Sequence, residues 1–123
     1  MRTAAQRIAK YNARMLSTLL DPTLAAVNAQ AVTNYNLYVQ DFYPKQVQMR
    51  TILDSFSMPT PMIAGFEAFF GELYHVSKVA TGDILTAAAA VLVTKWSDTA
   101  HLGAGNASVL KEVALGVFGI TVP

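Results

Sequence analysis

Apolar residues recur at intervals of three and four along most of the chain, the pattern of amphipathic helices. In the first stretch this spacing predicts a helix over residues 3–20, which includes the most basic part of the sequence. Asp21 and Pro22 suit a helix cap followed by proline in the first turn, so a second helix is expected to run to about Tyr43. Within it, Tyr35–Val39 also alternates like a strand, and helix and strand both remain open there.

Prolines divide the middle of the chain. Pro44 is expected to start a short third helix, because proline is well suited to the first helical turn. The stretch "SMPTP" over residues 57–61 is expected to be an extended break, since each proline disfavours helical geometry in the residue before it. The helical spacing resumes at Ile63, and "ATGD" over residues 80–83 predicts a turn and a helix cap.

The stretch from Ile84 to Thr94 contains no charged residue and is mostly aliphatic. It is too short to span a membrane, which takes about 20 predominantly apolar residues. A helix that is apolar on every side is typically buried all round. We therefore expect Ile84–Trp96 to form a central helix, covered by its own bundle and partly by neighbouring molecules.

The remainder predicts a glycine-broken loop over residues 101–108, with Asn106 as a helix cap, then a last helix and a short extended C-terminal tail over residues 119–123. The expected fold is all-α, a small bundle of about five to six helices. With 123 residues and no repeat or linker, the sequence predicts a single helical domain over residues 1–123.

Charged residues are scarce and unevenly placed. They make up 14% of the chain, against about 25% in typical globular proteins, while hydrophobic residues make up 53%. The centres of protein interfaces are depleted of charge, so charge-free runs favour surfaces that other subunits cover; an ordinary, weakly charged surface is the alternative. The absence of cysteine excludes disulfides and thiolate metal sites. The charge-free runs are residues 22–40, 55–66, 84–94 and 113–123.

The first predicted helix carries a coiled-coil spacing. We name as the seam five residues that follow one another at intervals of three and four: Ala5, Ile8, Asn12, Met15 and Leu19. A polar Asn within such a seam fixes register and the number of strands at some cost in stability. The seam therefore predicts an interface between copies within residues 1–20. The alternative is an amphipathic helix that docks on its own bundle, with Asn12 near the rim.

Opposite the seam, Arg7, Lys10 and Arg14 share one side of the helix, and we call them the basic face. Residues 1–20 hold four basic residues and no acid, whereas the rest of the chain holds five basic and eight acidic residues. The basic face could contact phosphates, a membrane surface or acidic patches on another copy, or it could face solvent alone. Nucleic-acid modules usually have a broader basic field with aromatic residues, so nucleic acid is not favoured.

Two carboxylate–histidine pairs have the spacing of metal ligands. Glu72 with His75, and Asp98 with His101, are each three residues apart, as in ferritin-like di-iron bundles. The alternative is that Glu72 pairs with His75 or faces water beside Lys78, with Asp98 as a cap and His101 in a loop. Because the pattern is short, we expect no metal and no other cofactor.

No nucleophile motif or phosphate-binding loop occurs, so an enzyme is not expected. The sequence favours a non-enzymatic structural subunit of a larger homo-oligomeric assembly, most plausibly a virion component such as a head, neck or tail protein of a tailed bacteriophage. Its partners would be copies of itself and other structural subunits, with no integral membrane segment. It would be located in the virion if viral and in the cytoplasm otherwise. The alternatives are a carboxylate–histidine metal-binding bundle and a peripheral membrane-binding helical protein.

Overall fold

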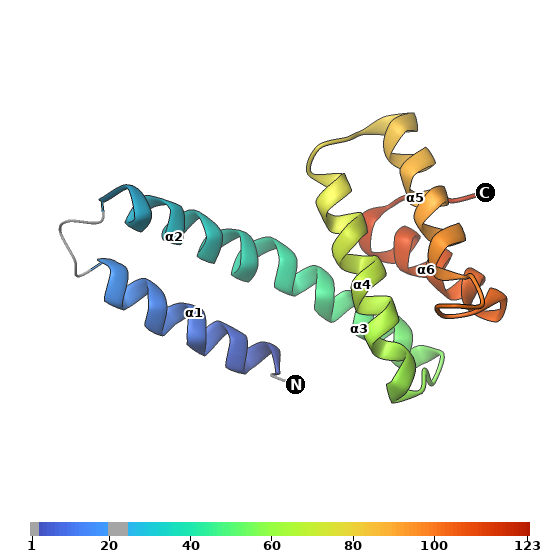
Figure 1. Cartoon of the computed structure of the whole chain (residues 1–123), viewed down its shortest axis with the longest axis horizontal. Helices are drawn as coiled ribbons and strands as arrows, with labels where there is room; N and C mark the ends of the chain where they lie inside the picture. Colours follow the sequence, from blue (N-terminus) through green and yellow to red (C-terminus); the bar gives the residue numbers. More distant parts are fainter. Residues whose placement is uncertain (1–2, 20–24) are drawn as a thin grey trace. The chain divides into compact units, whose positions relative to one another are not determined.

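The computed structural model describes residues 3–19 and 25–123 (Figure 1). Over these residues the chain forms six α-helices and no strand, which confirms the predicted all-α fold. A π-helical turn at Tyr38–Phe42 joins α2 to α3, and a short 3-10 turn at Ala104–Asn106 precedes α6. The six helices are α1 (Ala4–Leu19), α2 (Ala25–Leu37), α3 (Tyr43–Ser55), α4 (Thr60–Ser77), α5 (Gly82–Trp96) and α6 (Ala107–Phe118).

The chain divides into two compact units, Met1–Pro44 and Lys45–Pro123. The expectation of one domain over residues 1–123 stays a prediction. The cap expected at Asp21 and Pro22 lies outside the described residues. Among the described helices, none is both long enough and apolar enough to cross a bilayer.

In the first unit, α1 and α2 lie side by side and run in opposite directions (Figure 1). The start of α1 is fixed by a capping box. The Gln6 backbone N–H donates to the Thr3 hydroxyl over 3.1 Å, and the Thr3 backbone N–H donates to the Gln6 side-chain oxygen over 2.7 Å. Two N–H groups that have no partner within the helix are thereby satisfied.

The π turn at Tyr38–Phe42 stands directly before Pro44. Here the Tyr43 N–H donates to the carbonyl of Tyr38, five residues back. In an α-helix a proline clashes with the carbonyl four residues earlier, and a wider turn is one way to relieve that conflict. Helix α3 begins at Tyr43, within one residue of the start predicted at Pro44, but no break separates it from α2, because helical residues continue from Ala25 to Ser55. Tyr35–Val39 is helical as well.

The core of the second unit is built mainly from α4. Its four inward side chains recur at intervals of three and one, and all are fully buried: Phe66, Phe69, Phe70 and Leu73. Helix α6 adds Leu110 and Val113, and α3 adds Met49 and Leu53, all four fully buried. The rings of Phe70 and Phe118 tilt at 40° to one another, with centroids 5.6 Å apart. The aromatic cluster of this segment is therefore core, as its helical spacing indicates.

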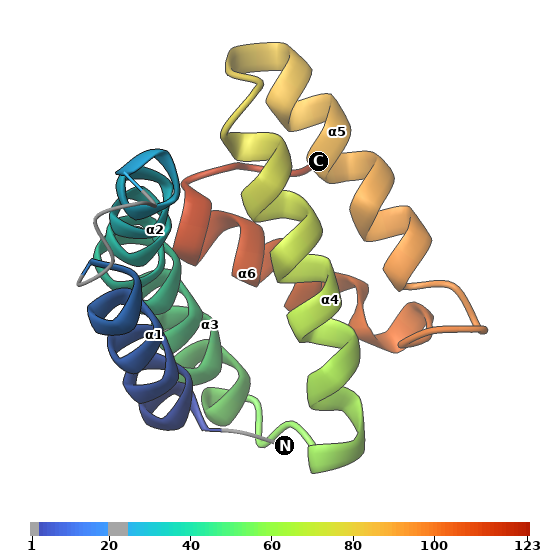
Figure 2. The same cartoon turned by 60° about the vertical axis from the view of Figure 1, so that its left-hand side comes forward.

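Helix α5 packs against α4 and α6 but is buried on one side only (Figure 2). Ala89 and Val93, four residues apart, face the core, whereas Ile84 and Val91 are 74% and 68% exposed. Its own bundle therefore covers one side of the helix, and the predicted cover of the other side by neighbouring molecules stays a prediction. The run contains no charged residue and only Thr86 and Thr94 as polar ones, so the sequence does not indicate which side of the helix meets the core.

Helix α4 contains a close contact that only glycine allows. A Cβ placed on Gly65 would lie 2.6 Å from Cδ2 and 3.1 Å from Cγ of Leu102, which is buried in the loop after α5. Further along the same helix, a Cβ on Gly71 would meet nothing within 4 Å. Both glycines are therefore in the same helix, but only Gly65 lies where a Cβ would clash with a neighbouring side chain.

The loops follow the sequence with two differences. Residues 56–59 separate α3 from α4, so the break lies where it was predicted but is shorter than residues 57–61, because Thr60 and Pro61 already belong to the first turn of α4. Asn106 precedes α6 at the cap position, but its amide donates back to the Leu102 carbonyl over 2.8 Å instead of capping α6. Helix α6 ends at Gly119, whose φ of 69° is left-handed, and the Ile120 N–H returns to the Ala114 carbonyl. This is a Schellman-type ending, and the residues beyond it form a tail without secondary structure.

Candidate functional site

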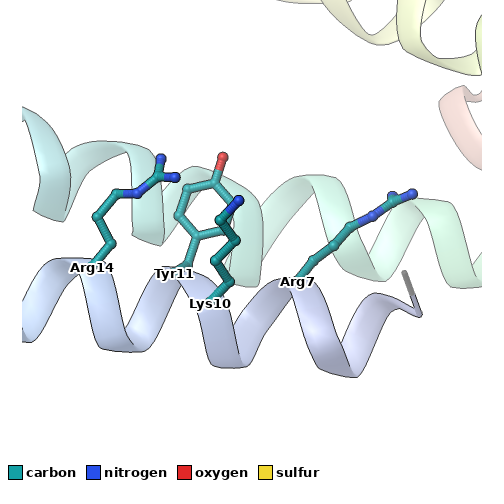
Figure 3. A pocket seen from close by; sticks show the side chains of 4 residues that line it. All are labelled: Arg7, Lys10, Tyr11 and Arg14. Atoms are coloured by element: carbon teal, nitrogen blue, oxygen red, sulfur yellow. The ribbon is translucent and has the colours of Figure 1, made fainter. Parts of the chain in front are cut away.

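The basic face of α1 borders a shallow hollow of about 270 Å³. Arg7, Lys10, Tyr11 and Arg14 line it, and all four extend from the same helix (Figure 3). Of the described residues, only these basic side chains and one phenol line the hollow, with no carboxylate among them. The structure therefore brings together the three cations that the sequence placed on one face.

Tyr11 is held in place by other aromatic rings of the first unit. Its ring stacks on that of Tyr38, with centroids 5.0 Å apart and planes 19° apart. Tyr38 in turn stacks with Phe42 at 5.8 Å and with Tyr43 at 6.4 Å. Stacked rings of this kind contribute about 0.5–1.5 kcal/mol per pair beyond their area, so they limit the movement of the Tyr11 ring.

The charges around Tyr11 are largely open to solvent. Lys10 and Arg14 are exposed, and Arg7 is half-buried. The guanidinium carbon of Arg14 lies 5.9 Å from the centre of the Tyr11 ring, a cation–π contact. Within residues 3–19 and 25–123, no carboxylate forms an ion pair with Arg7 or Lys10. Such a cluster can bind anions, and it offers no group arranged for nucleophilic or acid–base chemistry.

The predicted seam on α1 is only partly described. Ala5 and Asn12 are exposed and Ile8 is half-buried, while the side chains of Met15 and Leu19 lie outside the described part. The aromatic contact of α1 within its own unit is made by Tyr11, which is not a seam residue. An interface between copies through the seam stays a prediction.

Glu72 and His75, the first predicted metal pair, line a groove of about 600 Å³ beside α4 and α5. Lys95 of α5 donates to both carboxylate oxygens of Glu72, over 2.8 Å and 3.1 Å. The suggestion that Glu72 pairs with His75 or faces water beside Lys78 was therefore wrong. The partner is 23 residues away in sequence, which spacing along one helix cannot indicate.

The second predicted metal pair, Asp98 and His101, lies in the turn after α5. The His101 Nδ1 is 4.0 Å from the Asp98 Oδ1, and the His101 ring packs on Trp96 with centroids 4.6 Å apart. Asp98 also accepts a hydrogen bond from the Ala100 N–H, as a turn-capping residue does. Over the described ranges, no three His, Cys, Asp or Glu side chains gather as a metal site requires.

A second surface feature is the outer face of α5, formed by Ile84, Ala87 and Val91. These residues are three and four apart, all are exposed, and they lie opposite Ala89 and Val93. The sequence predicted that this run is covered by its own bundle and partly by neighbouring molecules, but it did not indicate which residues face outward. The exposed side of α5 can be recognised only when Ala89 and Val93 are known to face the core, and that depends on how the helices pack.

No protein-family model, curated protein or solved structure matches the chain.

Proposed function

We propose that this protein is a non-enzymatic structural subunit that assembles with further copies of itself. The observation that carries the proposal is the outer face of α5. Ile84 is 74% and Val91 68% exposed, with the exposed Ala87 between them. Large apolar side chains that line up on one exposed face typically mark an interaction surface.

A second copy of the same helix is the occupant that this face fits best. The outer face begins beside Asp83 in the first turn of α5 and ends at Lys95 in the last. When two copies of α5 pair in opposite directions about a two-fold axis, each Asp83 end meets a Lys95 end, and the apolar residues meet in the middle. Two-fold interfaces require this kind of self-complementary surface.

The groove beside α4 and α5 enlarges the surface beyond one helix face. It is lined by the apolar residues Ala68, Val76 and Leu92 and by the polar residues Glu72 and His75. Glu72 is ion-paired with Lys95 of α5. A stable interface buries about 800 Å² on each partner, which is more than one short helix face supplies. The groove provides additional apolar area next to the outer face.

The more specific form of the proposal is a virion component, such as a head, neck or tail protein of a tailed bacteriophage. The charge-free runs of the sequence and the exposed apolar face of α5 support a role in packing subunits together. Such a protein would contact other structural subunits besides its own copies. It would reside in the virion, or in the cytoplasm if the source is cellular.

The test is the oligomeric state of Val91→Glu, measured by light scattering beside the parent protein. Placing a carboxylate in the middle of an apolar interface leaves it desolvated and unpaired, so we expect dissociation to a smaller species. The matched control is Leu115→Glu on α6, which introduces the same charge at another exposed apolar position, 47% exposed. We expect this control to keep the parent's size.

Both variants change exposed positions, so circular dichroism should show the helical content of the parent. A parent protein that is monomeric at micromolar concentration would overturn the proposal. Equal dissociation in both variants, or none in Val91→Glu, would remove α5 as the surface that joins the copies.

A further inference from the structure

The basic face of α1 has features that a merely solvated surface does not need. Its central aromatic residue, Tyr11, is fixed by stacking on Tyr38, and three cations surround that residue over two helical turns. Figure 3 shows the Lys10 amine and the Arg14 guanidinium on the same side as the Tyr11 hydroxyl, with Arg7 about one turn away. We propose that Arg7, Lys10, Tyr11 and Arg14 bind a ligand that carries two or more phosphate groups.

Phosphate is the anion that these donor groups suit. A guanidinium presents a planar set of N–H donors that can contact two phosphate oxygens at once, and a lysine amine adds a compact charge. The Tyr11 hydroxyl adds a neutral donor from a ring that is already held in place. Among the described residues no carboxylate lines the hollow, and none forms an ion pair with Arg7 or Lys10.

The spread of the charges points to more than one phosphate. Arg7 and Arg14 are seven residues apart on a helix that rises 1.5 Å per residue, so their backbones are about 10 Å apart along the axis. A single phosphate bound near Lys10 and Arg14 would leave Arg7 unused. A chain of linked phosphates can contact all three cations.

The position of these cations in the helix also favours a bound anion. Arg7 follows the first turn of α1, which contains no acidic residue, and the last turn contains no basic one. Positive side chains near a helix N-terminus oppose the helix dipole, and a nearby anion offsets this. Binding is therefore expected to stabilise α1 as well as to neutralise its charges.

A membrane surface fits these contacts less well. An interfacial helix inserts the apolar side that lies opposite its polar face. In α1 the side opposite the basic face includes Ile8, which is half-buried, so part of that apolar side is already occupied. The basic face can meet a dissolved ligand without any change in this packing.

The experiment is calorimetric titration of the full chain at low ionic strength with tripolyphosphate and, separately, with orthophosphate. We expect tripolyphosphate to bind at least tenfold more tightly, because it can reach several cations. Lys10→Gln and Arg7→Gln should each weaken tripolyphosphate binding about tenfold, the effect of losing one hydrogen bond to a charged group. Tyr11→Phe, which removes only the hydroxyl, should weaken it by a smaller factor.

The matched control is Lys111→Gln on α6, which removes the same charge outside the hollow. We expect it to change affinity less than twofold. Equal weakening by Lys111→Gln and Lys10→Gln would show general charge attraction and overturn the site. Tripolyphosphate binding weaker than about 1 mM would also overturn it, even if vesicles with anionic lipids bound the protein.

A further titration with an oligothymidylate distinguishes two sources of linked phosphates, a nucleic acid and a small polyphosphate. If it binds more tightly than tripolyphosphate and Lys10→Gln weakens it as well, the phosphates belong to a nucleic acid. If it binds no more tightly while tripolyphosphate behaves as expected, the ligand is a small polyphosphate. Both results support a site for linked phosphates on α1.

Discussion

Replacing Gly65 with alanine tests the close contact between α4 and Leu102 in the loop after α5. The new Cβ would lie 2.6 Å from Cδ2 and 3.1 Å from Cγ of Leu102, both well inside normal contact distance. Cγ is a branch point, so Leu102 cannot relieve the overlap by turning its terminal methyl groups alone. Overpacking of this kind typically costs about 1–3 kcal/mol.

The intrinsic helix preference acts in the opposite direction. Alanine stabilises a helix interior by about 1 kcal/mol relative to glycine. Gly71→Ala isolates this gain, because it is in the same helix and its Cβ meets nothing within 4 Å. We therefore expect Gly71→Ala to raise the free energy of unfolding by about 0.5–1 kcal/mol relative to the parent. The free energy of unfolding of Gly65→Ala should be about 1–3 kcal/mol lower than that of Gly71→Ala.

Urea denaturation followed by circular dichroism measures both free energies, and equal slopes show that the two variants unfold to comparable states. In a Leu102→Ala background the overlap is absent, so Gly65→Ala should there become stabilising. The packing argument is refuted if Gly65→Ala is as stable as Gly71→Ala in the parent background.

Two further predictions concern α1 and α5. If the seam joins copies, Asn12→Leu should strengthen association and broaden the distribution of copy numbers in native mass spectrometry, because the polar residue no longer restricts register. One unchanged, sharp species would exclude the seam as an interface. Ala89→Leu should lower the free energy of unfolding by about 1–3 kcal/mol in thermal denaturation, because Ala89 is fully buried. Ala87→Leu, at an exposed position, should leave that free energy nearly unchanged, and equal losses in the two variants would contradict the side of α5 assigned to the core.

Much of the helical architecture follows from local sequence. The spacing of Phe66, Phe70 and Leu73 correctly indicates which side of α4 meets the core. The proline pair in "SMPTP" correctly indicates the break before α4. These features depend on residues within one or two turns, so a single sequence is sufficient to predict them.

Contacts between distant residues could not be predicted in this way. Lys95 reaches Glu72 across 23 residues, and Tyr11 stacks on Tyr38 across the gap between two helices. The basic face follows from spacing within one helix, but the aromatic support beneath it depends on how α1 meets the π turn. The continuous helical backbone around Pro44 could not be predicted for a related reason, since a widened turn accommodates the proline without a break between α2 and α3.

The one-sided burial of α5 separates folding from association in time. Only Ala89 and Val93 of this helix belong to the core, so the core of the second unit closes without the outer face. Folding of this unit then involves one chain and proceeds at a rate independent of protein concentration. In the assembly that we propose, covering Ile84 and Val91 requires an encounter between two folded chains, so the rate of that step falls as the protein is diluted. Under this proposal, folded subunits would accumulate first, and assembly would start when their concentration rises.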